Sequence, residues 1–180
     1  MDRTTPMAAL SLVVLAVTQL AGQSVPAACR EPVEAERKGF KTPHHAYATE
    51  QAAQPGQAVV HETIMSGGVS YILYKGKWRR SPLTPAEMLS QLDENLASAK
   101  VLNCELTGTE LVHGSPATVY LIHQTQPDFT TVIRLWVARS SGLVLRTEED
   151  MDTGDPAGKK HISIRYDYDN VQAPAGAEGP

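Results

Sequence analysis

The sequence predicts an α+β domain that is mainly antiparallel β, with a curled sheet of about seven or eight strands packed on one amphipathic helix. Two observations predict this fold class. Apolar and polar residues alternate with a period of two along most of the chain, which is typical of half-buried antiparallel strands. One segment with helical spacing interrupts that pattern. A sheet with so little helix to cover it is expected to curl over that helix as an incomplete barrel.

The N-terminus has the features of a secretory signal peptide, predicted to comprise residues 1–27. One cation, Arg3, precedes an apolar run at 7–17, and small residues follow up to Ala28. Val25-Pro26-Ala27 is the expected cleavage site, and the apolar run is too short to span a bilayer, which takes about 20 residues. These features predict export to the periplasm, and a buried or amphipathic helix at 7–17 is the alternative.

Cys29 and Cys104 are the two cysteines of the chain. In an oxidising compartment they are expected to form a disulfide that ties the new N-terminus to the domain and stabilises it by roughly 2–4 kcal/mol. Cys29 also follows Pro26-Ala27-Ala28, an imperfect lipoprotein signal in which proline replaces the usual aliphatic residue. Lipid anchoring at Cys29 is the alternative, and the two fates exclude each other because each uses the same sulfur.

Composition divides the rest of the chain into three parts. Residues 28–42 are charged and show no period, so they are expected to form an N-terminal leader. The half-barrel domain is expected at 43–171, and the Pro-, Gly- and Ala-rich tail at 172–180 is expected to be disordered. The net charge of −4, with one small basic cluster around Trp78, gives no indication of nucleic-acid binding.

Alternation predicts each strand, and glycine or small polar residues predict the turns. At 159–169, Ile162, Ile164 and Tyr166 alternate with polar residues, as in a half-buried strand. Ser66-Gly67-Gly68 and Ser140-Ser141-Gly142 are expected to form hairpin turns. The other predicted strands are 59–65, 69–74, a short one around Trp78, 102–106, 117–124, 133–137 and 143–145.

The single predicted helix extends from Pro85 to Ala99. Thr84 and Glu87 have the spacing of a capping box, and Pro85 suits the first helical position. An apolar stripe at helical spacing should lie against the sheet, and it consists of Met88, Leu89, Leu92 and Leu96.

The pattern of reactive residues does not indicate catalysis, a metal site or a cofactor. His44 and His45 are adjacent, so on a strand they would point to opposite faces and could not easily bind one ion. The carboxylates at 148–155 lack the flanking helices and distal glutamate of a calcium loop. Ser140 and Ser141 lack the strand-to-helix turn that holds a nucleophilic serine. The sequence therefore favours a protein that is not an enzyme.

One known superfamily shares the order of motifs in this chain. In chain order these motifs are Tyr71, the Gly76-Lys77-Trp78 turn, Gly114, the Leu135-Trp136-Val137 strand, the Gly142-Leu143-Val144-Leu145-Arg146 hairpin arm, and a last strand with Tyr166 that leads to Pro174. With these motifs, residues 44–174 resemble the LolA-like periplasmic lipoprotein carriers and the related LppX-type lipid-binding proteins, and also a group of small exported proteobacterial proteins. Val144 stands where that superfamily usually has proline.

The resemblance implies that the concave face of the sheet binds a lipid, an acyl chain of a lipoprotein or another hydrophobic ligand. The candidate ligand-binding residues are apolar side chains expected to face the concavity, although they also suit an ordinary core: Ile133, Leu135, Val137, Leu143, Leu145, Ile162, Ile164, Met88, Leu92 and Leu96. A second function stays open, namely an envelope protein-interaction or stress-sensing module without a lipid cavity. Its candidate contact surfaces are the basic hairpin at 75–80 and the acidic strand end at 148–152.

Overall fold

The computed structural model describes residues 25–52, 58–155 and 158–179. The described residues form nine strands, two α-helices and one short 3-10 helix. In chain order the elements are η1 (Ala27–Cys29), α1 (Arg30–Gly39), β1 (His44–Ala52), β2 (Val59–Ser66), β3 (Val69–Tyr74), β4 (Lys77–Arg80), α2 (Pro85–Ser98), β5 (Val101–Val112), β6 (Ser115–Thr125), β7 (Thr130–Ala138), β8 (Val144–Asp152) and β9 (Lys160–Asp167).

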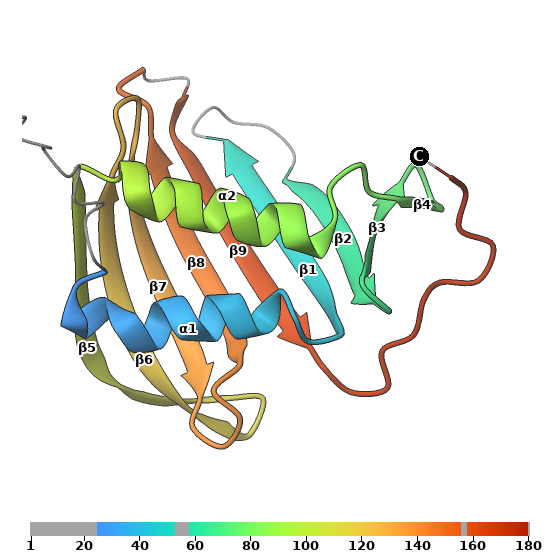
Figure 1. Cartoon of the computed structure of the whole chain (residues 1–180), viewed down its shortest axis with the longest axis horizontal. Helices are drawn as coiled ribbons and strands as arrows, with labels where there is room; N and C mark the ends of the chain where they lie inside the picture. The colour runs from blue at the N-terminus through green and yellow to red at the C-terminus, as the bar shows by residue number, and fades with distance from the viewer. Residues whose placement is uncertain (1–24, 53–57, 156–157, 180) are drawn as a thin grey trace, which may run out of the picture.

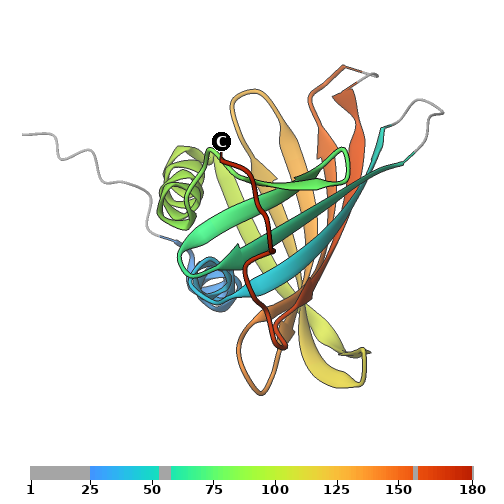
Figure 2. The same ribbon diagram turned by 90° about the vertical axis from the view of Figure 1, so that its right-hand side faces the viewer.

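The strands form a single antiparallel sheet in the order β4-β3-β2-β1-β9-β8-β7-β6-β5. The pairing of β1 with β9 brings the first and last strands together in the middle of the sheet. The sheet is strongly curled, and its edge strands β4 and β5 do not pair with each other (Figures 1 and 2). The predicted fold class, an α+β incomplete barrel, is therefore confirmed. The strand that the prediction did not include is β1, whose sequence HHAYATEQA has few apolar residues to alternate.

Both helices lie across the concave face, and the sheet curves around them (Figures 1 and 2). The capping box predicted for α2 is present. Thr84 Oγ1 accepts a hydrogen bond from Glu87 N at 3.2 Å, and the Glu87 carboxylate accepts one from Thr84 N at 2.7 Å. Of the helices that the structure describes, none is long and apolar enough to cross a membrane.

Helix α1 (Arg30–Gly39) lies within the segment predicted to be a charged leader without a period, and this part of it is instead a helix with a buried face. Pro32, Val33, Ala35 and Gly39 are buried, and together they form one face of the helix. Proline, alanine and glycine are a weak apolar signal in a charged sequence, so the helical period was hidden. The same small side chains allow α1 to pack closely on the sheet.

The predicted Cys29–Cys104 disulfide is present and ties the start of α1 to β5. Cys29 is completely buried, as expected for a structural cysteine. Because its sulfur is bonded to Cys104, Cys29 is not available for lipid anchoring in this fold.

The C-terminal tail is partly ordered, which corrects the prediction of disorder for the segment around Glu178. Glu178 forms a parallel bridge with Arg79: Arg80 N donates to Glu178 O at 3.0 Å, and Glu178 N donates to Trp78 O at 3.0 Å. The Glu178 carboxylate also forms ion pairs with Lys77 at 3.2 Å and Arg79 at 3.5 Å. The tail therefore covers part of the open edge of β4, where unpaired backbone groups would otherwise invite association.

The main hydrophobic core lies between α1 and strands β5–β8 on the concave side. It consists of Cys29, Val33, Ala35, Cys104, Tyr120, Ile122, Leu135, Val137 and Val144. A smaller cluster lies on the opposite, convex face and centres on Trp136. The Trp136 indole donates to Glu110 at 2.8 Å, and the Arg146 guanidinium lies 4.9 Å from the ring centre.

Candidate ligand-binding site between the helices and the sheet

Two neighbouring spaces lie between the helices and the first strands of the sheet. The outer groove has a volume of about 430 Å³ and lies between the start of α2, the end of α1 and the β2–β3 turn. The inner cavity has a volume of about 170 Å³ and lies deeper, against β1–β3 and β9. Phe40 and Met65 line both spaces, so the two adjoin.

The outer groove is lined mainly by apolar and small residues, with Met65, Gly67, Pro85 and Leu89 among them. Gly67 belongs to the β2–β3 turn and has a positive φ of 61°, which a glycine adopts without strain. Lys41 is the charged side chain at this groove. An apolar chain would therefore lose little polar hydration of the protein on entering here.

The spaces exist because the two helices pack on the sheet to different depths. The buried face of α1 fills the concavity over β5–β8 with the main core. In contrast, the described part of α2 contains no buried residue, and its apolar stripe of Met88, Leu89, Leu92 and Leu96 is only half-buried. One half of the concave face is thus filled by the protein, and the half over β1–β3 is covered but not filled.

Polar contacts hold α2 mainly through its C-terminal half. Arg37 of α1 forms an ion pair with Asp93 at 2.7 Å. Gln126 donates to Asn95 O at 2.7 Å and accepts from Ser98 Oγ at 3.1 Å. The N-terminal half of α2, which borders the outer groove, has its own cap but no comparable polar contact with the sheet among the described residues. We therefore expect this end of the helix to move more easily.

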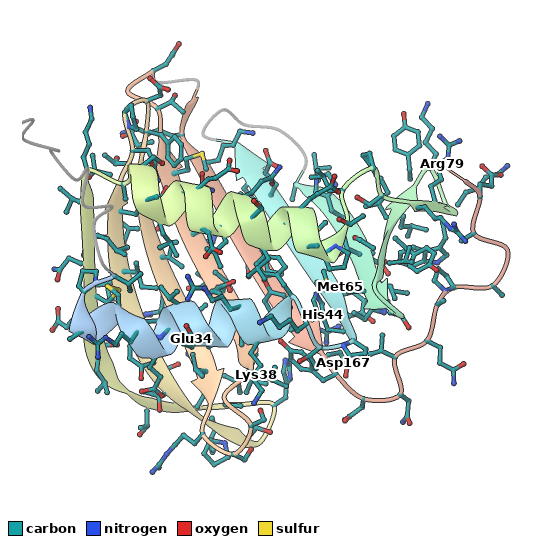
Figure 3. The ribbon with its side chains drawn as sticks, in the orientation of Figure 1. Glu34, Lys38, His44, Met65, Arg79 and Asp167 are labelled. Atoms are coloured by element: carbon teal, nitrogen blue, oxygen red, sulfur yellow. A yellow bond between two sulfur atoms is a disulfide. The ribbon has the colours of Figure 1, made fainter. Side chains whose placement is uncertain are left out.

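The inner cavity is polar on the side of α1 and β9. Glu36, His44, Tyr166 and Tyr168 line it together with apolar residues. His44 and Met65 lie beside each other at the C-terminal end of α1 (Figure 3), and they are paired across β1 and β2. The His44 ring meets Tyr166 edge-on, with 5.5 Å between the ring centres.

Burial changes the acid–base behaviour of these groups. Burial, and then the nearby Glu149 carboxylate, raise the pKa of Glu36 to about 7. Burial also raises the pKa of Glu149 and of the Tyr166 and Tyr168 hydroxyls. It lowers the pKa of His44, which favours the neutral ring. Near neutral pH the inner cavity therefore contains a carboxyl group that is close to half-protonated.

The predicted site residues of β7 contribute to the filled half of the concavity. Leu135 and Val137 are almost completely buried in the main core, and Ile133 and Leu96 pack against it. Ile133, Leu135 and Val137 thus lie in the core beneath α1, and Leu96 of α2 packs against the same cluster. We therefore assign them to the core of the protein and look for ligand contacts elsewhere.

The prediction that Leu143 and Leu145 share the concave face is wrong for Leu145. A register shift between Trp136 and Val137 pairs Val137 with Val144, so Val144 joins the concave core. Leu145 instead packs with Trp136 on the convex face, and Leu143 is buried in the loop before β8. An irregularity of this kind turns the following side chains to the other face of a sheet, and a strict alternation cannot anticipate it.

The remaining predicted site residues lie closer to the open half. Met88 lines the inner cavity from α2, and Leu92 is half-buried one turn further along the helix. Ile162 and Ile164 are half-buried on β9, on the same face as the core-packed Tyr166. Met88 is therefore the predicted residue that the structure places most directly at the candidate site.

The other residues considered for chemistry are not brought together. His44 points to the concave side, while His45 points away and stacks on Tyr47 at 4.1 Å, as their adjacency on one strand predicted. The described residues contain no group of three or more His, Cys, Asp or Glu side chains arranged to hold a metal. The turn at Ser140-Ser141-Gly142 is confirmed: Gly142 has φ 65°, and Ser141 Oγ accepts from Leu143 N at 3.3 Å.

Sequence reasoning missed the residues that shape the two spaces. Phe40 and Glu36 belong to or follow α1, which was not predicted, and Met65 was treated only as the end of a strand. One signal could have revealed α1. Its acidic residue Glu31 lies in the first turn and Arg37 and Lys38 lie in the last, which matches the helix dipole.

Comparisons with known proteins give similarities of structure. No protein-family model matches the chain, and no curated protein matches it either. Solved structures with a similar chain include the lipoprotein LppX of Mycobacterium tuberculosis (11% identity, TM-score 0.47, 84% of this chain and 100% of that one) and LprF of Mycobacterium bovis (11%, 0.44, 85% and 98%). MucB is also similar, at 17% identity and a TM-score of 0.46, over 84% of this chain and 63% of MucB. These similarities are similarities of structure at low sequence identity.

Proposed function

We propose that the protein is an exported, non-enzymatic binding protein that holds the apolar chain of a ligand between α2 and strands β1–β3. The observation that carries this proposal is the contrast between the two halves of the concave face. Over β5–β8 the side chains of α1 fill the concavity. Over β1–β3 the apolar stripe of α2 stands above an outer groove of about 430 Å³.

Physical considerations support an apolar occupant. The outer groove falls within the range of about 300–1,000 Å³ that is usual for small-molecule sites. The half-buried Met88 and Leu89, which line the two spaces, would gain roughly 25 cal/mol for each additional Å² that a ligand removes from water. A ligand chain between α2 and the sheet would bury the apolar side chains of α2 that are only half-buried without it.

Two features support the proposed export to the periplasm. The signal-peptide pattern at 1–27 ends close to Cys29. The Cys29–Cys104 disulfide is stable in an oxidising compartment and would be reduced in a bacterial cytoplasm. The predicted cleavage after Ala27 would leave this disulfide within the first residues of the mature chain.

A titration with the fluorescent hydrophobic probe N-phenyl-1-naphthylamine tests the proposed site. We expect saturable binding to the wild-type protein. Met88→Trp should weaken it at least roughly tenfold because the larger ring occupies the inner cavity. Gln91→Trp is the matched control, since Gln91 is exposed on the same helix. Equal binding by both variants would show that the probe binds elsewhere.

A second candidate function is a protein-interaction module, and the edge strand β5 favours it. Leu106 and Leu111 of β5 are 62% and 72% exposed, which is unusual for large apolar side chains on a sheet edge. The charged surfaces predicted as partner contacts already form ion pairs within the chain. Lys77 and Arg79 pair with the tail, and Glu148 pairs with Arg146.

Site-specific photo-crosslinking would distinguish this second function. A crosslinker in place of Leu106 should capture a discrete envelope protein if β5 is an interface, and Leu111→Glu should abolish the capture. A crosslinker in place of the exposed Ser90 of α2 is the control. If both positions give the same diffuse products, the exposed leucines of β5 are not an interface.

A further inference from the structure

The inner cavity has a chemical asymmetry that constrains the ligand. Its walls towards α2 and β2–β3 carry Met65, Ile72 and Met88, whereas its wall towards α1 and β9 carries Glu36, Tyr166 and Tyr168. The outer groove opens beyond the apolar side through the shared residues Phe40 and Met65. A ligand that fills both spaces would therefore place one end against polar groups.

The ionisable groups around Glu36 are a second carboxyl group, two neutral phenols and a neutral imidazole. Glu149 faces it from β8, and the Tyr166 and Tyr168 hydroxyls face it from β9 and the segment that follows. His44 of β1 contributes a ring held in the neutral form. Among the described residues that line the inner cavity there is no lysine or arginine, and Glu36 forms no ion pair with a described residue. A half-buried carboxylate without a cation is costly, so this site favours a proton or an external cation.

The neighbouring polar groups mostly offer hydrogen-bond acceptors. Tyr168 donates its hydroxyl proton to Val144 O at 2.7 Å, which leaves the phenolic oxygen as an acceptor. Thr147 lies on the concave face of β8, is 5% exposed, and its hydroxyl lies within hydrogen-bonding reach of the Tyr166 hydroxyl.

We propose that the inner cavity receives the cationic, hydrogen-bond-donating head group of an amphiphile, a primary ammonium, whose apolar chain lies in the outer groove under α2. This inference rests on the proposed function and specifies the class of its ligand. An ammonium offers three donors and one positive charge, which match the acceptors and the uncompensated carboxyls of the cavity. A carboxylate or phosphate head group would be repelled at the same place. Lys41, at the outer groove, is the position that an anionic head group would select instead.

Three probes with the same chain test the proposal: dodecylamine, dodecanol and dodecanoate, each below its critical micelle concentration. Their affinities are measured by displacement of N-phenyl-1-naphthylamine near neutral pH. We expect dodecylamine to bind at least roughly tenfold more tightly than dodecanoate, with dodecanol between them. Equal affinities, or a preference for dodecanoate, would overturn the assignment of an ammonium site.

Substitution of Glu36 tests whether its carboxyl group causes the preference for the ammonium head group. Glu36→Gln should reduce the ratio of dodecylamine to dodecanoate affinity to near one. Glu94→Gln removes the same charge from the exposed face of α2 and should preserve the ratio. If both variants change the ratio equally, the preference reflects net charge and the proposed site is wrong.

The pH dependence supplies an independent readout. Because Glu36 loses its proton near pH 7, the affinity for dodecylamine should rise between about pH 6 and about pH 8, and that for dodecanol should not. Failure of the proposed function and failure of the ammonium site give different results in these experiments. If none of the three probes displaces the fluorophore, the proposed function itself fails. If all three bind without head-group preference, the function stands and the ammonium site is refuted.

Discussion

Glu36 is the residue whose environment most changes its ordinary chemistry. It projects from α1 into the inner cavity, where burial and Glu149 raise its pKa to about 7, from an ordinary value of 4.5. The folded state therefore holds this proton more tightly than the unfolded state does. The protonated form contributes stability that is fully present below about pH 4.5 and is lost as the pH rises through about 7. At the scale of single residues, the carboxyl group of Glu36 in the cavity therefore lowers the stability of the folded state at neutral pH.

The variant Glu36→Gln tests this cost, because glutamine keeps the shape and cannot ionise. Relative to the wild type, the variant should gain on the order of 2 kcal/mol in free energy of unfolding between about pH 5 and about pH 8. Urea denaturation at both pH values measures the difference. Glu94→Gln should show no such gain, and a pH-independent difference between wild type and Glu36→Gln would contradict the raised pKa.

Helices α1 and α2 perform different tasks although both cover the same face of the sheet. The disulfide at Cys29 and the small buried face of α1 hold it against β5–β8. Helix α2 lies on the other half with a half-buried stripe and polar contacts near its C-terminal end. The ion pair between Arg37 and Asp93 links the two helices, and both of its side chains are partly exposed. At the scale of elements, α1 belongs to the core, and we expect α2 to act as a movable cover.

Arg37→Met tests whether the link between the helices restrains the cover. A partly exposed ion pair contributes about 0.2–1 kcal/mol, so amide hydrogen exchange in α2 should accelerate by roughly two- to fivefold. Exchange in the core strands β7 and β8 should not change. Arg139→Met, at an exposed arginine of the β7–β8 turn, is the control. Uniform acceleration over the whole sheet would show that α2 is part of the cooperative core.

The elements differ in how far the sequence could predict them. The capping box of Thr84 and Glu87 and the alternation around Ile162 are local signals, and the structure has α2 and β9 where they predicted. Helix α1 was missed because its buried face uses proline, alanine and glycine, and the face of Leu145 was missed because a register shift depends on the neighbouring strand. The pairing of Glu178 with Arg79 joins segments about a hundred residues apart, which a local pattern cannot show. The sequence predicted ligand contacts on β7, whereas the candidate site lies beside β1–β3. Only tertiary packing reveals which half of the concavity α1 fills, so a local pattern could not show this difference.

The whole molecule is a curled sheet with one filled half and one unfilled half. The filled half gives the fold its core, and the unfilled half is free to bind a ligand without disturbing that core. This division explains why a short chain with two helices can retain a space of ligand size. It also explains why the residues that look most apolar in the sequence are not those that border the space.

Native mass spectrometry of the protein purified gently from the bacterial envelope tests the central claim most directly. We predict that wild-type protein carries discrete additional masses that disappear on denaturation, and that Met88→Trp carries them at much lower occupancy while Gln91→Trp matches the wild type. A bare polypeptide mass for all three proteins, before and after incubation with lipid extract, would contradict the claim that the space between α2 and the sheet holds an apolar ligand.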